Sequence, residues 1–201
     1  MMKKTLLILA AALSGVLAAG AQTGREWQDP AVNEINRLPM RSSFAAGERL
    51  SLDGVWKFHW VRNASERPSG IGAVDYDDAA WGSMPVPGMW ELNGYGDPVY
   101  VNIGYAWRGN FRNDPPYVPD AENHVGSYRR TFDIPASWGG KDIFLSIGSA
   151  TSNVYVWVNG RFVGYSEDSK LAAQFDITKF VKPGENLIAC LLYTSDAADE
   201  L

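Results

Sequence analysis

Apolar and polar residues alternate along several short segments, which is the pattern of β-strands with one buried face. The first clear case is 51–60, where Trp56 and Phe58 share one face and Lys57 and His59 share the other. We expect the two aromatic side chains to be buried and His59 to be a solvated histidine rather than a ligand. No run of useful length has the period of an amphipathic helix.

Further strands are expected in the second half of the chain. They cover residues 127–134, 142–147, 154–158, 161–165 and 186–189. Short strands separated by turn signals at intervals of about 8 to 12 residues are typical of an all-β sandwich. The Pro- and Gly-rich stretch 63–90 predicts loops and short edge strands.

The strongest local signal is a β-hairpin. Alternating residues 154–158 are followed by Asn159-Gly160, which favours a type I′ turn, and residues 161–165 form the return strand. The polar run Ser166 to Lys170 follows directly and is longer than a structural turn requires. We therefore interpret this run as a candidate functional loop on a rigid platform.

The first residues indicate export. Lys3-Lys4 precede an apolar run over 5–17, and Ala19-Gly20-Ala21 forms a cleavage site. Residues 1–21 are therefore predicted to be a signal peptide of a periplasmic or extracellular bacterial protein. The apolar run is too short for a good transmembrane helix. Residues 22–50 are expected to form an arm that wraps the domain.

Composition narrows the function classes. The net charge of −5 and the absence of a Lys/Arg run argue against binding to nucleic acid or to an anionic membrane. Cys190 is the only cysteine, which excludes an internal disulfide and a cysteine-based metal site. The eight tryptophans and nine tyrosines are interpreted mainly as core residues.

Several polar residues are better explained as structural than as catalytic. The acidic stretch 75–78 lacks the glycine turn and distal glutamate of a calcium loop, and His124 has no second metal ligand in view. Glu167 and Asp168 are adjacent, so on an extended segment they face opposite sides. Two carboxyl groups that act together on one bond must both face it, about 5 Å apart.

Four segments, in order and spacing, resemble the N-terminal sugar-binding jelly roll of glycoside hydrolase family 2, above all that of bacterial beta-galactosidases. They read L-D-G-V-W-K-F, P-V-P-G-M-W-E-L-N-G-Y-G-D-P-V-Y-V-N-I-G-Y, P-P-Y-V-P-D-A-E-N-H-V-G-S-Y-R-R-T-F and V-W-V-N-G-R-F-V-G-Y-S-E-D-S-K-L-A-A-Q-F-D-I-T. The resemblance runs from about Glu26 to Ala189. It implies a jelly-roll β-sandwich of the galactose-binding kind over 51–189.

The resemblance also implies a function. The parent protein would be an exported beta-galactosidase, a retaining hydrolase of terminal non-reducing β-D-galactose residues in carbohydrate metabolism. Its catalytic glutamates would lie in sequence that this chain does not contain, so the chain alone is expected to be inactive. The family further implies sodium and magnesium as cofactors, a galactoside as substrate, and a homo-oligomeric full-length enzyme.

Two substrate-binding residues follow from the matching motifs. Asn102 lies in P-V-Y-V-N and Asp168 in G-Y-S-E-D-S-K, and the family's aspartate also contacts the sodium ion. An amide can both donate to and accept from a sugar hydroxyl, and a carboxylate is a strong acceptor and a hard ligand for a cation. Without the resemblance, these residues would be interpreted as a turn residue and a solvated loop charge.

Two alternatives stay open. One is a stand-alone jelly-roll carbohydrate-binding module, since this fold serves many binding functions. The other is a different family 2 specificity, such as a glucuronidase or a mannosidase, which the two motifs fit less well.

The end of the chain departs from the family. Residues 190–201, C-L-L-Y-T-S-D-A-A-D-E-L, resemble a translated sequencing adapter. We therefore expect a domain that is incomplete at its C-terminal end beyond Ala189. The nucleotide sequence of the gene would decide whether these residues belong to it.

Overall fold

The computed structural model describes residues 24–40, 47–96 and 117–194. Within these ranges the chain forms strands and single 3-10 turns, with no α-helix. The strands are β1 (Glu34–Ile35), β2 (Gly54–Val61), β3 (Gly82–Val86), β4 (Val125–Ile134), β5 (Phe144–Ile147), β6 (Asn153–Val158), β7 (Arg161–Glu167), β8 (Ala173–Asp176) and β9 (Gly184–Tyr193). The 3-10 turns are η1 (Glu26–Gln28), η2 (Ala64–Glu66), η3 (Glu91–Asn93) and η4 (Ala136–Trp138). The expected signal peptide over 1–21 lies outside the described residues.

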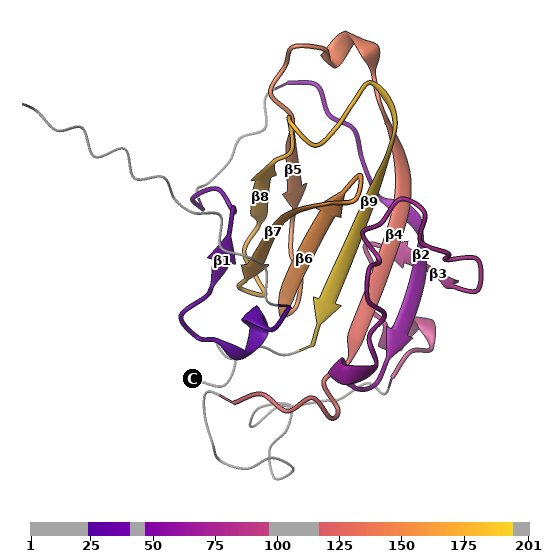
Figure 1. Cartoon of the computed structure of the whole chain (residues 1–201), viewed down its shortest axis with the longest axis vertical. Helices are drawn as coiled ribbons and strands as arrows, with labels where there is room; N and C mark the ends of the chain where they lie inside the picture. The colour runs from indigo at the N-terminus through magenta and orange to yellow at the C-terminus, as the bar shows by residue number, and fades with distance from the viewer. Residues whose placement is uncertain (1–23, 41–46, 97–116, 195–201) are drawn as a thin grey trace, which may run out of the picture.

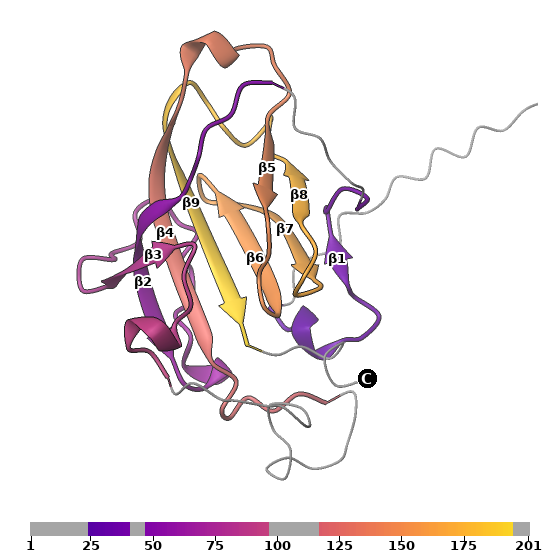
Figure 2. The ribbon, with the colours of Figure 1, turned by 180° about the vertical axis from the view of Figure 1, so that it is seen from behind.

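The strands form two antiparallel sheets. The large sheet has the order β1-β7-β6-β9-β4-β2-β3, and β5 pairs with β8 in a small second sheet. Figure 1 shows the large sheet across the molecule, and Figure 2 shows the small sheet in front of β6 and β7. The predicted all-β sandwich is confirmed.

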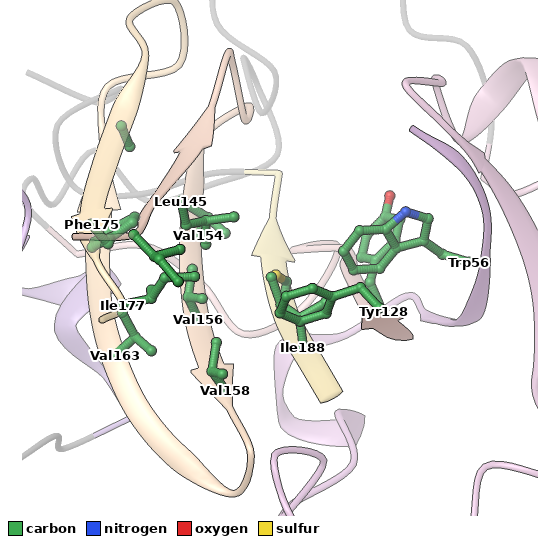
Figure 3. Close-up of a cluster of buried hydrophobic side chains, with 14 of the residues drawn as sticks. Trp56, Tyr128, Leu145, Val154, Val156, Val158, Val163, Phe175, Ile177 and Ile188 are labelled. Atoms are coloured by element: carbon green, nitrogen blue, oxygen red, sulfur yellow. The ribbon is translucent and has the colours of Figure 1, made fainter. Parts of the chain in front are cut away.

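The main core lies between the two sheets. Apolar side chains of β6 on the large sheet pack against those of β5 and β8 on the small one, and Trp56 of β2 and Tyr128 of β4 extend the same cluster on the other side of β9, as Figure 3 shows. Trp56 and Phe58 are buried as predicted, at 6% and 1% exposure, whereas Val55 on the opposite face of β2 is 69% exposed. His59 differs from the expectation, because its ring is half-buried and stacks on Trp81 with centroids 5.6 Å apart.

Part of the outer face of the large sheet is covered by the N-terminal arm. Trp27 of η1 is fully buried there, and its ring stacks on that of Tyr193 with centroids 5.4 Å apart. The Tyr155 hydroxyl donates a hydrogen bond of 2.8 Å to Oε2 of the buried Glu26. Burial, together with the Glu26 charge, raises the pKa of Tyr155, so this hydroxyl stays a donor. The arm is therefore part of the fold.

The hairpin prediction is confirmed at the level of single residues. Asn159 and Gly160 both have positive φ, 49° and 81°, as a type I′ turn requires. The Asn159 side chain also bonds the neighbouring strand, because its Oδ1 accepts from the Leu187 amide at 2.9 Å. The turn thus fixes both the register of β6 with β7 and its junction with β9.

A β-bulge interrupts the hairpin. Val156 pairs with Gly164 and Trp157 pairs with Phe162, so Val163 is an extra residue in β7. A bulge of this kind shifts the alternation of the strand by one position. Beyond it, Tyr165 lies on the outer face of the large sheet, where its ring centroid is 4.5 Å from that of Tyr155.

Gly164 is expected to be intolerant of a side chain. An added Cβ would lie 2.4 Å from the Ile35 carbonyl oxygen of β1 and 2.7 Å from the Phe175 ring. We expect Gly164→Ala to lower the free energy of unfolding by about 1–3 kcal/mol, because a backbone oxygen and a packed ring must both move. The control is Gly148→Ala, where nothing lies within 4 Å of the added carbon. Urea unfolding of both variants checks this, and equal midpoints would contradict it.

The last strand extends past the expected domain end at Ala189. Cys190 to Tyr193 continue β9, which pairs with β4 on one side and β6 on the other. The residues alternate between the faces, with Cys190 toward the inner core and Leu191 toward the outer cluster. Burial raises the pKa of the Cys190 thiol to about 12, so the thiol is protonated at neutral pH. Whether these residues come from an adapter stays a prediction about the nucleotides.

Candidate functional site

Asp168 lies directly after β7 and is exposed. Its φ is 95°, a backbone conformation that residues with a side chain rarely adopt. Its carbonyl oxygen accepts a hydrogen bond of 3.3 Å from the Leu171 amide, which closes the turn toward β8. The rigid hairpin therefore presents this carboxylate to solvent at one end of the sheet.

The predicted polar loop is shorter than the sequence indicated. Ser166 and Glu167 belong to β7 and are only 4% and 3% exposed, so the loop begins at Asp168. Their polar groups are hydrogen-bonded inside the fold. The Tyr165 hydroxyl donates to Glu167 Oε1, and Ser166 Oγ accepts from Arg37 at 3.0 Å. These partners come from outside the run itself, which is why its burial was not expected.

Glu167 and Asp168 occupy different environments. Glu167 is buried beside Tyr165, whereas Asp168 is exposed. The two adjacent carboxylates therefore face different surroundings, as expected at the end of an extended strand. Among the two, Asp168 is the residue that a ligand can reach.

A cavity of about 10 Å³ lies beside the Asp168 turn, between the two sheets. This volume is roughly that of one water molecule, so a sugar ring cannot enter it. A sugar that binds Asp168 must therefore lie on the exposed side of the turn. The cavity is lined by Ile147, Ala150, Val154, Ser166, Glu167, Asp168, Leu171 and Ala173.

Asn102, the other predicted substrate-binding residue, lies outside the described residues. The expectation that Asn102 and Asp168 form one sugar pocket therefore stays a prediction.

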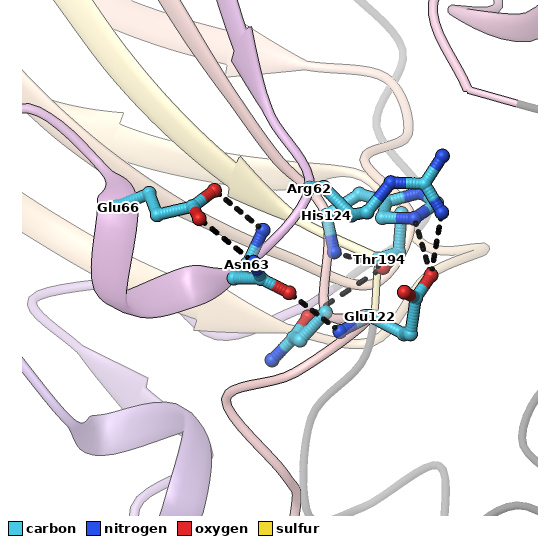
Figure 4. Close-up of polar contacts among 7 residues, drawn as sticks. Arg62, Asn63, Glu66, Glu122, His124 and Thr194 are labelled. Atoms are coloured by element: carbon cyan, nitrogen blue, oxygen red, sulfur yellow. Dashed lines mark hydrogen bonds and ion pairs between the residues drawn. The ribbon is translucent and has the colours of Figure 1, made fainter.

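A second polar cluster lies at the same end of the large sheet, around the start of β4 (Figure 4). Glu122 Oε2 accepts from Arg62 Nη1 at 3.0 Å and lies 3.7 Å from His124 Nε2. The His124 amide donates to Thr194 Oγ1 at 3.1 Å. These contacts tie the ends of β2, β4 and β9 together.

The structure offers no ready metal centre within the described ranges. No group of three or more His, Cys, Asp or Glu side chains that could hold a metal ion occurs there. In the acidic stretch 75–78, Asp78 binds the buried Arg129 at 2.8 Å, which gives it a structural role. Among the described residues no helix is long and apolar enough to cross a bilayer.

Sequence reasoning missed the residues that support the Asp168 turn. The Ser149 hydroxyl donates to the Ser169 carbonyl oxygen at 2.7 Å, and the Glu167 amide donates to the Asn33 carbonyl oxygen at 3.0 Å. Arg37 also reaches this turn from the arm. Each of them is distant in sequence, so no local pattern identifies it.

Comparisons with known proteins assign this β-sandwich to a family. Residues 50–198 match the family described as "Glycosyl hydrolases family 2, sugar binding domain". The chain therefore belongs to glycosyl hydrolase family 2.

Curated relatives extend this assignment. The chain is 39% identical over 179 residues to a beta-galactosidase of Halalkalibacterium halodurans, covering 83% of this chain and 18% of that protein. It is 43% identical over 149 residues to a beta-galactosidase of Priestia megaterium, covering 74% of this chain and 14% of that protein. The chain thus spans less than a fifth of the length of these two relatives.

Solved structures show the same fold. A family 2 glycosyl hydrolase of Bacteroides cellulosilyticus superposes with a TM-score of 0.51 and 26% identity, over 72% of this chain and 17% of that one. A beta-glucuronidase of Bacteroides uniformis, solved with a covalently bound cyclophellitol aziridine, gives a TM-score of 0.52 at 21% identity, over 72% of this chain and 14% of that one. The second likeness concerns the fold alone.

Proposed function

We propose that this chain is the N-terminal sugar-binding part of an exported bacterial beta-galactosidase. The parent enzyme releases terminal β-D-galactose from the non-reducing end of galactosides and works as a homo-oligomer. This part supplies Asp168 and Asn102 to the substrate pocket. The glutamates that break the glycosidic bond lie outside this chain, so the chain alone binds sugar without hydrolysing it.

The observation that carries the proposal is the position of Asp168. It is the exposed carboxylate of a left-handed turn at the end of a braced strand, in a domain of the sugar-binding family. The curated relatives named beta-galactosidase support galactose as the sugar, since they are 39% and 43% identical to this chain. A turn held in a rare conformation is a common feature of binding sites.

Asp168 would act by orientation. An ionised carboxylate accepts short hydrogen bonds from sugar hydroxyls and holds the ring in one position. Fixing the ring against the catalytic groups lowers the entropic part of the barrier. In a retaining hydrolase, one carboxylic acid then protonates the leaving oxygen, and a second carboxylate forms the glycosyl-enzyme. Asp168 takes no part in these covalent steps.

The donor chemistry of Asp168 fits a sodium ion, because a carboxylate is a hard oxygen ligand. A sodium ion bound there would supply positive charge that orients the carboxylate and a sugar hydroxyl. Among the described residues no group of three or more His, Cys, Asp or Glu side chains surrounds it, so a full set of ligands would have to include other oxygens. For magnesium, the second ion that the family resemblance implies, we propose no ligand among the described residues.

Asp168→Ala in the complete enzyme is expected to lower kcat/KM for a β-galactoside by about 10- to 100-fold. This range corresponds to the loss of one hydrogen bond to a charged group. The matched control is Asp133→Ala, an exposed aspartate of β4 at the opposite end of the sheet. Glu167 would be a poor control because it is buried. Steady-state kinetics with a chromogenic galactoside, with and without sodium, measure both variants.

Two results would contradict the proposal. If Asp168→Ala and Asp133→Ala have equally small effects, Asp168 does not belong to the sugar pocket. If the wild-type enzyme prefers a β-glucuronide or a β-mannoside to the galactoside, the family holds but the substrate is wrong. If sodium still changes the activity of Asp168→Ala, only the proposed role of Asp168 as a sodium ligand is contradicted.

A further inference from the structure

The arm residue Arg37 contacts the last two residues of β7. Its Nη1 atom donates to Ser166 Oγ at 3.0 Å and to the Glu167 carbonyl oxygen at 3.1 Å. Its Nε atom donates to Glu34 Oε2 at 2.7 Å, so the guanidinium is held from the other side by an acidic residue of β1. The Arg37 side chain is only 8% exposed. The Arg37 guanidinium is therefore buried and held by hydrogen bonds to both β1 and β7.

The backbone of β1 supports the same point of β7. Glu34 lies opposite Ser166 in the ladder, and the Glu167 amide donates to the Asn33 carbonyl oxygen at 3.0 Å. Both polar groups of the Glu167 backbone are therefore bound by the arm. The strand is held in place up to the residue that precedes Asp168.

The Glu167 carbonyl belongs to the peptide unit that joins Glu167 to Asp168. The torsion angle φ of Asp168 is measured relative to this planar unit, so the orientation of the unit helps to set φ. That φ is 95°, which an aspartate holds only when its surroundings impose it. On the other side, the Leu171 amide binds the Asp168 carbonyl oxygen. Arg37 thus acts on the peptide plane that sets where the Asp168 carboxylate points.

We infer that Arg37 is a positioning residue for substrate binding, which acts through the Glu167 carbonyl and the Ser166 hydroxyl to hold Asp168 in its sugar-binding conformation. This inference rests on the proposed function of Asp168. An arginine suits this positioning role because its guanidinium is planar and rigid. Its Nε and Nη2 atoms bind Glu34, and its Nη1 atom binds β7. A lysine has one charged atom and cannot span these partners.

A double-mutant cycle in the complete enzyme tests the inference. Arg37→Met is expected to lower kcat/KM for the galactoside by about 10-fold or more, because the carboxylate loses its fixed direction. In an Asp168→Ala background the same substitution is expected to have no further effect. Arg25→Met is the control within the arm, since Arg25 is 58% exposed and pairs with Asp120 at 3.7 Å. Arg25→Met should leave kcat/KM unchanged.

The outcomes separate the two proposals. If Asp168→Ala has no effect, the proposed role of Asp168 fails. Two results would contradict the positioning role of Arg37 while leaving the role of Asp168 intact, provided that Asp168→Ala lowers kcat/KM. In the first, Arg37→Met alone does not lower kcat/KM. In the second, Arg37→Met lowers kcat/KM by the same factor in the Asp168→Ala background as in the wild type. Thermal unfolding checks that each variant is folded. If Arg37→Met does not fold, Arg37→Lys is used instead. It is expected to lower kcat/KM by the same factor and to have no further effect in the Asp168→Ala background. Wild-type kcat/KM of the lysine variant would overturn the inference.

Discussion

Replacing Trp27 with alanine is expected to lower the free energy of unfolding by about 3–5 kcal/mol. Trp27 is fully buried between the arm and the outer face of the large sheet, and it stacks on Tyr193 of β9. Removing the indole leaves a cavity between η1 and β9. A loss of this size is a large fraction of the 5–15 kcal/mol that stabilises a typical domain.

The comparison variant for Trp27→Ala is Leu92→Ala. Leu92 is 78% exposed in the described structure, so its truncation should change the unfolding free energy by no more than about 0.5 kcal/mol. Guanidinium titration followed by tryptophan fluorescence and by far-ultraviolet circular dichroism measures both. An unchanged midpoint for Trp27→Ala would mean that the arm is not part of the cooperative fold.

Arg129→Met is expected to have a similar effect, a loss of about 3–5 kcal/mol. The Arg129 side chain is 4% exposed, and its Nε atom binds Asp78 Oδ2 at 2.8 Å. Its Nη1 atom donates to the carbonyl oxygens of Ile71 and Ala73, at 2.9 Å for the latter. Methionine retains apolar volume but leaves these acceptors without their donor.

An exposed ion pair formed by another arginine provides the control for Arg129→Met. Arg62 binds Glu122 at 3.0 Å, but the two side chains are 49% and 55% exposed. Arg62→Met should therefore cost no more than about 1 kcal/mol, since exposed ion pairs contribute little. Chemical denaturation ranks the two variants. A cost for Arg129→Met as small as that for Arg62→Met would show that water takes over the role of the buried guanidinium.

The sandwich was predictable because its signals are local. The alternation in β2 and β6 identifies the buried face from neighbouring residues, and Asn159-Gly160 specifies a turn by backbone conformation alone. The exposed position of Asp168 after the hairpin follows from the same local pattern. These features need no knowledge of distant segments.

The burial of Ser166 and Glu167 could not be predicted in this way. It depends on the extra residue Val163, which shifts the alternation of β7, and on Arg37, which lies 129 positions from Ser166 in sequence. Polar residues are stable inside a fold only where such partners exist. A sequence pattern records the polar residues but not their distant partners, so it indicated a longer loop.

The same limit applies to the acidic stretch 75–78. Its residues gave no calcium-loop pattern, but nothing nearby identified Arg129 of β4 as the partner of Asp78. The pairing of Asn102 with Asp168 rests on family resemblance and lies beyond the described residues. The described residues therefore bear on the proposed site through Asp168 and the arm residues that contact its turn.

The place of β9 in the large sheet has a consequence for folding kinetics. β9 is the last described strand in sequence but lies in the middle of the sheet, between β4 and β6. Until residues 184–193 have been synthesised, β2, β3 and β4 cannot join β6 and β7 in one sheet. Contacts between such distant parts of a chain form slowly. The sheet therefore closes late, and a ribosome must finish nearly all of the described chain before its two halves can meet.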